Sequence, residues 1–364
     1  MFDWIPISSY AAIYYHLLMA LTLVTLMHAY SNDLFSAGTK TFSQTAGVFL
    51  LLFVCLYMGN RPVSGYFIDM AAYAGVYRKL QAGELIVVKS DFIFNYFMIT
   101  CSKIMNERWF FFLCGLLYTL PCYLFSKKYF GAYWYFGFFI FVGSYMFWPF
   151  GTNGIRNGLG TSFFILALCF YNRKIVLYLL MALALGIHNS LIIPIAAFFV
   201  SGIYKNSKIY LWIWFAAIPL SLIGGSFWES FFGGLGFGDD TRAEDYLTKG
   251  NINNDEFSST GFRWDFLFYS SFAVFAGWYF IFKKNVTDKF YIHMWGTYMI
   301  ANTFWILVIR ANFSNRFAYL SWFLMAPVIA YPLLRYKLLP NQYRVIGLLI
   351  ALYYIFTYLM FILK

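Results

Sequence analysis

An arginine and a histidine lie inside stretches of this sequence that otherwise read as lipid-soluble helix. Arg156 follows Asn153 and Gly154, with further glycines close by and Pro149 just upstream. A guanidinium placed in a bilayer costs free energy, so an intramembrane arginine indicates a functional site by default. The glycines and the proline loosen the start of this helix, which would leave backbone N–H groups open to an anion. We interpret the stretch as the floor of a site that handles phosphate at the membrane surface.

Two further residues could supply acid–base chemistry. His188 is followed by Asn189 and Ser190 in an apolar run, and histidine is the usual general base near neutral pH. A histidine in this setting can equally be a hydrogen-bonded core residue, and that alternative stays open. Asp69 follows Arg61 by eight residues, so it could pair with that arginine, bind sugar hydroxyls or accept a proton. Pairing is the favoured reading of Asp69, and both residues remain candidates for catalysis.

The arginines outside the basic clusters all fall on one side of the membrane when apolar segments are counted in alternation. They are Arg61, Arg78, Arg108, Arg156, Arg242, Arg263, Arg310 and Arg316. Outward arginines break the positive-inside rule, and a planar guanidinium suits bidentate binding of phosphate or carboxylate. The alternative is pairing with a nearby acid or a lipid headgroup, which we favour for those in polar segments, Arg78, Arg108 and Arg242. The predicted anion-binding residues are Arg61, Arg156, Arg263, Arg310 and Arg316.

Composition places these residues in a polytopic helical membrane protein. Of the 364 residues, 62% are hydrophobic and only 11% are charged, whereas about 25% are charged in soluble domains. The net charge of +11 is mostly topology signal, since the lysine-rich clusters lie between apolar runs and mark the cytoplasmic side. We therefore expect no nucleic-acid partner. The five cysteines have no metal-like spacing and are expected to be core residues.

Spans of about 20 apolar residues are required to cross a bilayer. The predicted fold is all-α, a single integral membrane domain over 1–364 with about 11–13 spans. Expected spans are 10–29, 43–60, 108–125, 129–150, 154–172, 209–224, 264–282, 290–309, 317–334 and 345–363. Between the basic residues at 173 and 205 the chain should form two short helices, 175–187 and 189–203, with His188 at their turn. The segment near 61–107 lies outside, partly embedded, with a re-entrant helix at 92–106, and a polar loop near 226–263 lies on the same side.

The order of these motifs resembles the EpsG-like group of Wzy polymerases, bacterial enzymes that polymerise O-antigen or capsule repeat units. The matching residues are Arg61, Asp69 and Tyr73, then the run from Asn153 through Arg156 to Leu159, then Ile187 to Ser190, and finally Asn315-Arg316-Phe317. The family's arginine motif usually reads Arg-Gln-Gly-Leu-Ala, whereas Asn157 and Gly160 stand here in place of the Gln and the Ala. The resemblance therefore does not extend to the side chain that follows the arginine.

The resemblance implies glycosyl transfer on the periplasmic face of the bacterial inner membrane. The donor would be a glycan on undecaprenyl pyrophosphate, and the acceptor hydroxyl of a second lipid-linked unit would attack its anomeric carbon. Guanidiniums facing the departing pyrophosphate would lower the barrier, and His188 or Asp69 would take the proton. Tyr73 and Asn153 would help to bind substrate. Arginines can replace a divalent ion, so we expect neither a metal nor another cofactor.

Two other functions share these features. A flippase or transporter of lipid-linked oligosaccharide would also need a cationic cavity, but it should show corresponding halves, and no internal repeat is visible. An O-antigen ligase would use the same residue types, and only the motif order favours a polymerase. A scaffold without activity is disfavoured by Arg156 and His188. The sequence leaves open whether a chain-length regulator or a flippase binds this protein.

Overall fold

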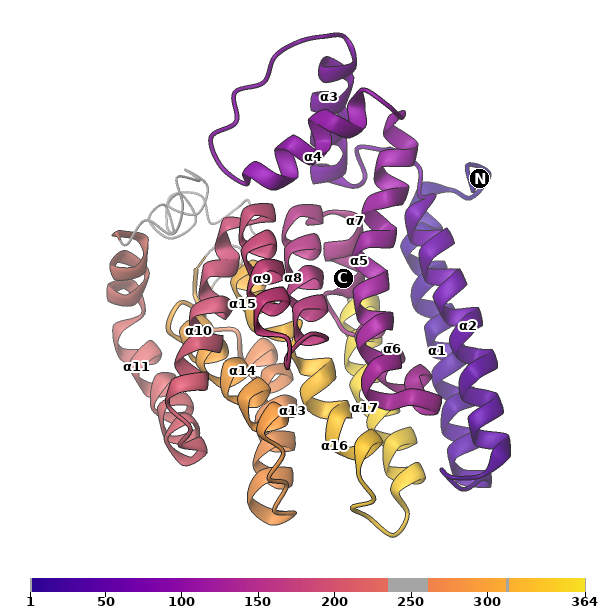
Figure 1. Ribbon diagram of the computed structural model, residues 1–364, viewed down its shortest axis with the longest axis vertical. Helices are drawn as coiled ribbons and strands as arrows, with labels where there is room; N and C mark the ends of the chain where they lie inside the picture. Colours follow the sequence, from indigo (N-terminus) through magenta and orange to yellow (C-terminus); the bar gives the residue numbers. More distant parts are fainter. Residues whose placement is uncertain (1, 235–260, 312–313, 364) are drawn as a thin grey trace. The chain divides into compact units, whose positions relative to one another are not determined.

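The computed structural model describes residues 2–234, 261–311 and 314–363. Across these residues the chain forms helices joined by turns and loops, with no strand among them (Figure 1). The all-α fold is thereby confirmed. Most of the polar loop predicted near 226–263, together with Arg242, lies outside the described residues.

Seven described helical stretches are long and apolar enough to cross a membrane. They are α1 (Ile7–Ser31), α2 (Ala37–Gly59), α5 with α6 (Glu107–Val142), the Ser207–Gly225 part of α11 (Ser207–Gly234), α13 with the π-helical turn η4 (Trp264–Lys283), α15 with α16 (Ser314–Arg335), and α17 (Gln342–Ile362). The chain is therefore a multi-pass membrane protein.

Four shorter apolar helices accompany them: α4 (Phe92–Ser102), α8 (Ile155–Leu168), α9 (Lys174–Ile187), and η2 with α10 (Asn189–Ile203). The predicted span 129–150 is divided among η1 (Gly131–Tyr133), α6 (Trp134–Val142) and α7 (Phe147–Thr152). The span predicted at 154–172 is only the 14 residues of α8. Fourteen residues rise about 21 Å, less than the roughly 30 Å of hydrocarbon, so breaks near Gly143 and Gly154 make these helices shorter than their apolar runs.

Contacts divide the chain into two compact units, Met1–His188 with Ala330–Lys364, and Asn189–Ile329. The boundary in the C-terminal half falls within α16 (Met325–Arg335). That the whole chain acts as one membrane domain stays a prediction.

In the first unit, α1 packs along α17, α2 along α5 and α6, and α8 lies between α5 and α9. Close approach depends on small residues at two of these contacts. A Cβ on Gly47 would lie 2.6 Å from the Trp134 ring, and one on Gly115 would lie 3.1 Å from the Gly59 backbone. All five cysteines are buried free thiols, as expected of packing residues.

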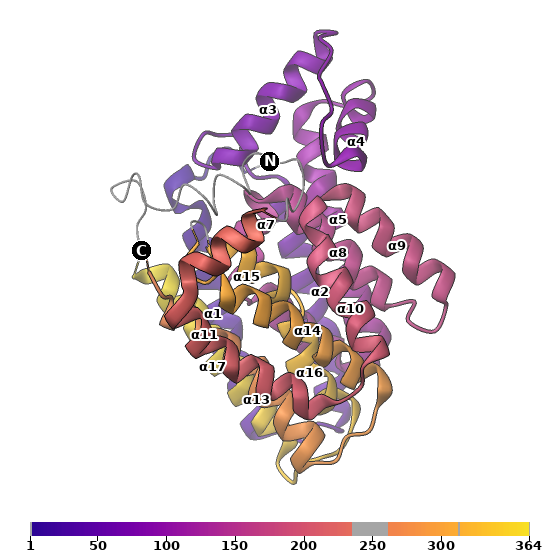
Figure 2. The same ribbon diagram turned by 90° about the vertical axis from the view of Figure 1, so that its left-hand side faces the viewer.

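The segment between α2 and α5 forms an outer layer at one end of this unit. It holds α3 (Ile68–Gln81) and α4 (Phe92–Ser102), and both views show these helices at the N-terminal end of α5 (Figures 1 and 2). The basic pair Lys127-Lys128 lies in the last turn of α5, at the opposite end. With 11 residues, α4 is too short to cross the bilayer. Its partial embedding stays a prediction.

The second unit packs α10 (Ile192–Ile203), α11, α13 (Trp264–Trp278) and α15 (Ser314–Trp322) around α14 (Lys289–Leu307). Its centre is a buried polar network in which the Asn302 amide donates to the hydroxyls of Ser270 (3.1 Å) and Ser321 (2.9 Å). Trp214 Nε1 donates to the Asn302 Oδ1 at 2.7 Å. Hydrogen bonds of this kind join helices where apolar burial gives no advantage over lipid.

Candidate active site

A break between two helices carries Arg156. Helix α7 ends at Thr152, Asn153 and Gly154 leave the helix, and α8 begins at Ile155. A Cβ on Gly158 would lie 2.5 Å from the carbonyl oxygen of Phe150, so only glycine lets the first turn of α8 pack directly on α7. The N–H groups of Gly154 and Ile155 donate to the carbonyls of Pro149 (3.1 Å) and Asn153 (2.8 Å), so the helix start is less open to an anion than the sequence predicted.

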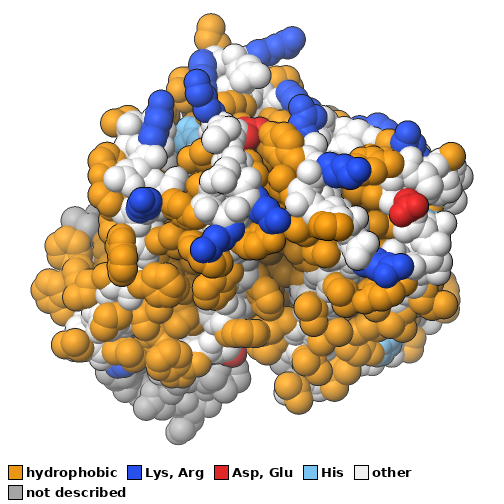
Figure 3. All heavy atoms as spheres, turned by 90° about the horizontal axis from the view of Figure 1, so that it is seen from below, with side chains coloured by type: hydrophobic (Ala, Val, Ile, Leu, Met, Phe, Trp, Pro, Cys, Tyr) orange, Lys and Arg blue, Asp and Glu red, His pale blue; other side chains and the backbone are white. Residues whose placement is uncertain are grey.

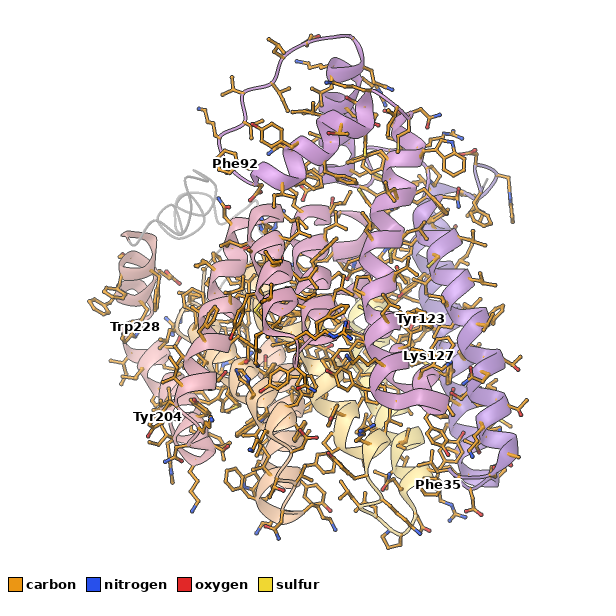
Figure 4. All side chains as sticks on the ribbon, in the orientation of Figure 1. Phe35, Phe92, Tyr123, Lys127, Tyr204 and Trp228 are labelled. Carbon is orange, nitrogen blue, oxygen red and sulfur yellow. The ribbon has the colours of Figure 1, made fainter. Side chains whose placement is uncertain are left out.

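The guanidinium of Arg156 contacts a carboxylate that is distant in sequence. Arg156 Nη1 donates to Asp91 Oδ2 at 2.5 Å. The Asp91 side chain is 2% exposed and that of Arg156 is 18% exposed, so this ion pair is shielded yet reachable from one side. Asp91 directly precedes α4, next to Phe92, which is labelled in Figure 4. Burying two charges costs desolvation free energy, and only good geometry between them offsets it. A shielded ion pair of this kind is typical of a functional site and not of a solvated surface.

The backbone of Asp91 adopts the left-handed conformation, with φ 49° and ψ 47°. Non-glycine residues rarely adopt it, although aspartate tolerates it better than most. Asn95 Nδ2 donates to the carbonyls of Ser90 (2.8 Å) and Asp91 (3.2 Å), which holds this turn in place. Backbone conformations of this type concentrate where surrounding contacts hold a functional side chain.

His188 meets the same carboxylate. It ends α9 in an extended conformation, and its Nδ1 lies 3.2 Å from Oδ2 and 3.3 Å from Oδ1 of Asp91. An ionised carboxylate only accepts hydrogen bonds, so Nδ1 carries a hydrogen, and in the neutral tautomer with this hydrogen Nε2 is the acceptor. The prediction that His188 lies at the turn between helices 175–187 and 189–203 is confirmed by α9, η2 and α10. The contact with Asp91 therefore selects the tautomer of a neutral His188 ring.

Helix α3 contacts both Arg156 and the helix break that precedes it. The Tyr73 hydroxyl accepts from Arg156 Nε at 2.7 Å, and Asn153 Oδ1 accepts from the backbone N–H of Asp69, also at 2.7 Å. Asp69 and Tyr73 are four residues apart and therefore share one face of α3. Burial raises the pKa of the Tyr73 hydroxyl above its usual value, and the nearby Arg156 guanidinium opposes that shift. Tyr73 consequently stays a neutral hydroxyl that orients the guanidinium.

We call these six residues the Arg156 cluster: Asp69, Tyr73, Asp91, Asn153, Arg156 and His188. The sequence singled out five of them and missed Asp91. The available signal was an acid immediately before the apolar segment 92–106, but nothing in the sequence links position 91 to position 156 or 188. No acid lies close to Arg156 along the chain, and the fold supplies one from another segment.

Arg61 lies near the cluster's framework but bonds elsewhere. It is 3% exposed, and its guanidinium donates to the carbonyls of Met58 (2.8 Å) and Thr152 (3.2 Å) and lies 5.7 Å from the Phe111 ring centroid. Burial lowers its pKa to about 10, so it stays charged at neutral pH. The contact with Thr152, which precedes Asn153, ties the end of α2 to the helix break. This position suits a structural support for the break.

The other predicted anion-binding arginines belong to the second unit. The Arg263 guanidinium donates two hydrogen bonds to the Asp265 carboxylate, from Nε (3.0 Å) and from Nη2 (2.6 Å). For Arg263, the alternative of pairing with a nearby acid therefore applies. Arg310 is exposed and donates to the carbonyl of Leu222 at 3.4 Å, and Arg316 is half-buried on α15. Their convergence with Arg156 on one anion stays a prediction.

Arg78 and Arg108 pair with acids, as the sequence favoured. Arg78 Nε lies 2.8 Å from Glu107 Oε2, and Arg108 Nη1 lies 3.1 Å from Asp3 Oδ2. Both pairs are exposed, and neither residue contributes to the Arg156 cluster.

Comparison with known proteins identifies a family. The model of the EpsG family matches residues 44–364, a range that contains every residue of the Arg156 cluster. No curated protein and no solved structure matches the chain.

Proposed function

We propose that this chain, which belongs to the EpsG family, is a membrane glycosyltransferase that joins lipid-pyrophosphate-linked oligosaccharide units into polysaccharide. Family membership supports a polysaccharide polymerase in general terms. The observation that carries the finer proposal is the Arg156 cluster, where one buried carboxylate holds both a guanidinium and an imidazole. Glycosyl transfer from a lipid pyrophosphate needs both groups, one for the departing anion and one for the attacking hydroxyl.

In the proposed reaction, the acceptor sugar hydroxyl gives its proton to Nε2 of His188 while its oxygen bonds to the anomeric carbon of the donor. The bond between that carbon and the pyrophosphate oxygen breaks, and the electron pair leaves with the lipid pyrophosphate. Arg156 faces the charge that develops on that oxygen, in a shielded site where fixed donors lower the barrier most. Asp91 is a positioning residue, because it orients the His188 ring and fixes the plane of the Arg156 fork.

Asp91 also offsets part of the positive charge of Arg156, so one arginine is a modest anion binder by itself. We assign Arg310 and Arg316 as further contacts to the pyrophosphate or glycan. Arg263 is a weaker candidate, because its fork is held by Asp265. Asp69 and Tyr73 are assigned to the glycan side, where a carboxylate and a neutral hydroxyl suit sugar hydroxyls. His188 is favoured over Asp69 as the base because its accepting nitrogen is defined by its bond to Asp91.

We infer the side of the membrane from the distribution of charge. Within the first unit, the Arg156 cluster lies at the end that holds α3 and α4, and Lys127 lies toward the other end (Figures 1 and 4). Basic residues mark the cytoplasmic side, so we place the cluster on the periplasmic face of the bacterial inner membrane. Lipid-linked donor and acceptor would be aligned there by their membrane-buried tails, which supplies proximity.

The glycan ladder of a deletion strain complemented with variants tests this function. Complementation with Arg156→Ala should leave carrier or core bearing a single repeat unit and no long chains. In purified protein, the turnover of Arg156→Ala should fall about 10²–10³-fold below that of the wild type. Arg156→Lys should have about a tenth of the wild-type turnover or less, since an ammonium cannot form the two parallel hydrogen bonds of a guanidinium. Arg108→Ala is the matched control, because that arginine is exposed and paired with Asp3. A full ladder with Arg156→Ala would refute the assignment, and loss of all repeat units from the core in the deletion strain would favour a ligase or flippase.

A further inference from the structure

A cavity of about 670 Å³ lies in the first unit between the loop joining α1 to α2 and the loop joining α16 to α17. Its lining includes Tyr30, Asp33, Phe35, Lys337 and Arg344. The side chains of Asp33, Lys337 and Arg344 are exposed, so the cavity opens outward through charged groups. None of these residues takes part in the Arg156 cluster.

Both loops are held by hydrogen bonds of their own. The buried Gln342 side chain accepts from the N–H groups of Leu338 (2.7 Å) and Leu339 (3.2 Å) and donates to the carbonyls of Leu333 and Tyr336. On the facing wall, Ser36 Oγ accepts from the N–H of Thr39 (3.1 Å), and the Thr39 hydroxyl donates to the carbonyl of Asp33 (2.7 Å). The walls are thus preorganised, which reduces the ordering cost of binding.

The two cationic side chains of the cavity each lie over an aromatic ring. Lys337 Nζ lies 6.0 Å from the Phe35 ring centroid, and Arg344 Cζ lies 5.6 Å from that of Tyr30. Neither has a carboxylate partner among the residues that the structure describes. With Asp33 as the one acid among these lining residues, two positive charges face one negative charge. The lining therefore favours an anion and also offers a carboxylate that can accept from hydroxyls.

The cavity lies at the basic end of its unit. Phe35 in the cavity wall and Phe92 beside the Arg156 cluster are at opposite ends of the unit in Figure 4. Figure 3 views the structure from below, the side on which Phe35 lies in Figure 4, and Lys and Arg side chains are far more frequent there than Asp and Glu side chains. By the positive-inside rule this end faces the cytoplasm, where anionic headgroups attract basic residues and basic pockets between helices bind them.

We propose that this cavity binds the phosphodiester headgroup of an anionic, hydroxyl-bearing phospholipid of the inner leaflet. Lys337 and Arg344 contact the phosphate, and the Asp33 carboxylate accepts hydrogen bonds from headgroup hydroxyls. The same phosphodiester chemistry occurs in soluble, deacylated headgroups, which the experiment separates from the intact lipid. The inference does not rest on the proposed glycosyltransferase function.

The test uses the delipidated full-length protein in detergent and two short-chain lipids, phosphatidylglycerol and phosphatidylcholine, with binding measured by native mass spectrometry. The wild-type protein should prefer phosphatidylglycerol by about tenfold or more, since each basic residue near a membrane surface contributes roughly fivefold. The double variant Lys337→Gln with Arg344→Gln should reduce that preference to about twofold or less. The matched control is Lys40→Gln with Arg335→Gln, which removes the same charge from exposed residues outside the cavity and should keep the preference.

Two further arms complete the design. Lys337→Gln alone should lose about fivefold, which keeps the test valid if the double variant is unstable. Competition by glycerophosphoglycerol would identify a soluble phosphodiester as a sufficient ligand, and its failure would identify the lipid as the source. The proposal is overturned if the wild type shows no preference, or if both cavity variants keep the wild-type preference.

Discussion

Arg156 and Asp91 are 65 positions apart in the chain, yet Nη1 of one lies 2.5 Å from Oδ2 of the other. Asp91 also meets Nδ1 of His188, so a single buried carboxylate connects the start of α8 to the end of α9. Helix α3, which belongs to the segment between α2 and α5, supplies the remaining contacts of the site. The site therefore depends on how three separate parts of the first unit pack, and its predictions can be tested one contact at a time.

Asp91→Asn should lower kcat by about tenfold to a hundredfold while KM changes little, because outer hydrogen-bond partners orient catalytic groups rather than bind substrate. The amide keeps the shape but loses the charge that selects the His188 tautomer. Steady-state kinetics with purified lipid-linked units checks this. Asp3→Asn, which affects an exposed partner of Arg108, is the control. A raised KM with unchanged kcat would assign Asp91 to substrate binding instead.

His188→Ala should abolish turnover, and added imidazole should restore part of it, since a small base can enter the space left by the ring. The recovery should be absent in His188→Gln, whose side chain fills that space. Single-turnover product formation is the measurement. Substantial turnover by His188→Gln without added imidazole would contradict the base assignment and move it to Asp69.

Gly158→Ala should destabilise the protein by about 1–3 kcal/mol, because the new Cβ would lie 2.5 Å from the Phe150 carbonyl oxygen. Shifting α8 away from α7 also displaces Arg156, so turnover should fall with stability. Thermal unfolding and turnover are compared with Gly75→Ala on α3, where nothing lies within 4 Å of the added carbon. That control should be neutral or stabilising by about 0.4–1 kcal/mol. Equal behaviour of the two variants would contradict the packing argument.

The orientation of the first unit can be checked with introduced cysteines, because the five native ones are buried. Val87→Cys lies in the exposed loop between α3 and α4, and Arg335→Cys lies at the C-terminal end of α16. A membrane-impermeant maleimide should label the first in spheroplasts and the second only after the membrane is opened. The reverse labelling pattern would place the Arg156 cluster on the cytoplasmic side and would contradict the proposed reaction on the periplasmic face.

Glu229, in the part of α11 beyond Gly225, predicts a pH effect on stability. Burial raises its pKa above the usual value and Arg310 opposes the shift, while its Oε1 is buried with no hydrogen-bond partner among the described residues. A carboxyl with a raised folded pKa stabilises the fold while protonated, and that contribution is lost as pH rises from its usual pKa through the raised one. Glu229→Gln should therefore raise the free energy of unfolding at pH 7.5 by roughly 1 kcal/mol, with a smaller difference at pH 5.

Thermal unfolding at both pH values measures this difference. Glu84→Gln, on an exposed glutamate, should show no such pH dependence. A less stable Glu229→Gln at pH 7.5 would mean that attraction to Arg310 outweighs desolvation.

The sequence by itself determined the features that depend on local hydrophobicity and backbone preference. Apolar run lengths predicted an all-helical membrane protein, the basic residues on either side of 175–203 predicted two short helices with His188 between them, and Asn153-Gly154 predicted a loosened helix start. Motif order also indicated the family to which the chain belongs. Each of these signals is carried by neighbouring residues or by their order along the chain.

Only the tertiary structure decided which side chains meet. Nothing near position 91 in the sequence identifies Arg156 and His188 as its partners, and nothing near Arg61 shows that its guanidinium binds the carbonyls of Met58 and Thr152. Hydropathy reports whether a segment suits an apolar environment, because that depends on its average composition. The choice of a hydrogen-bond partner depends on the relative placement of whole helices, and packing across distant segments sets that placement.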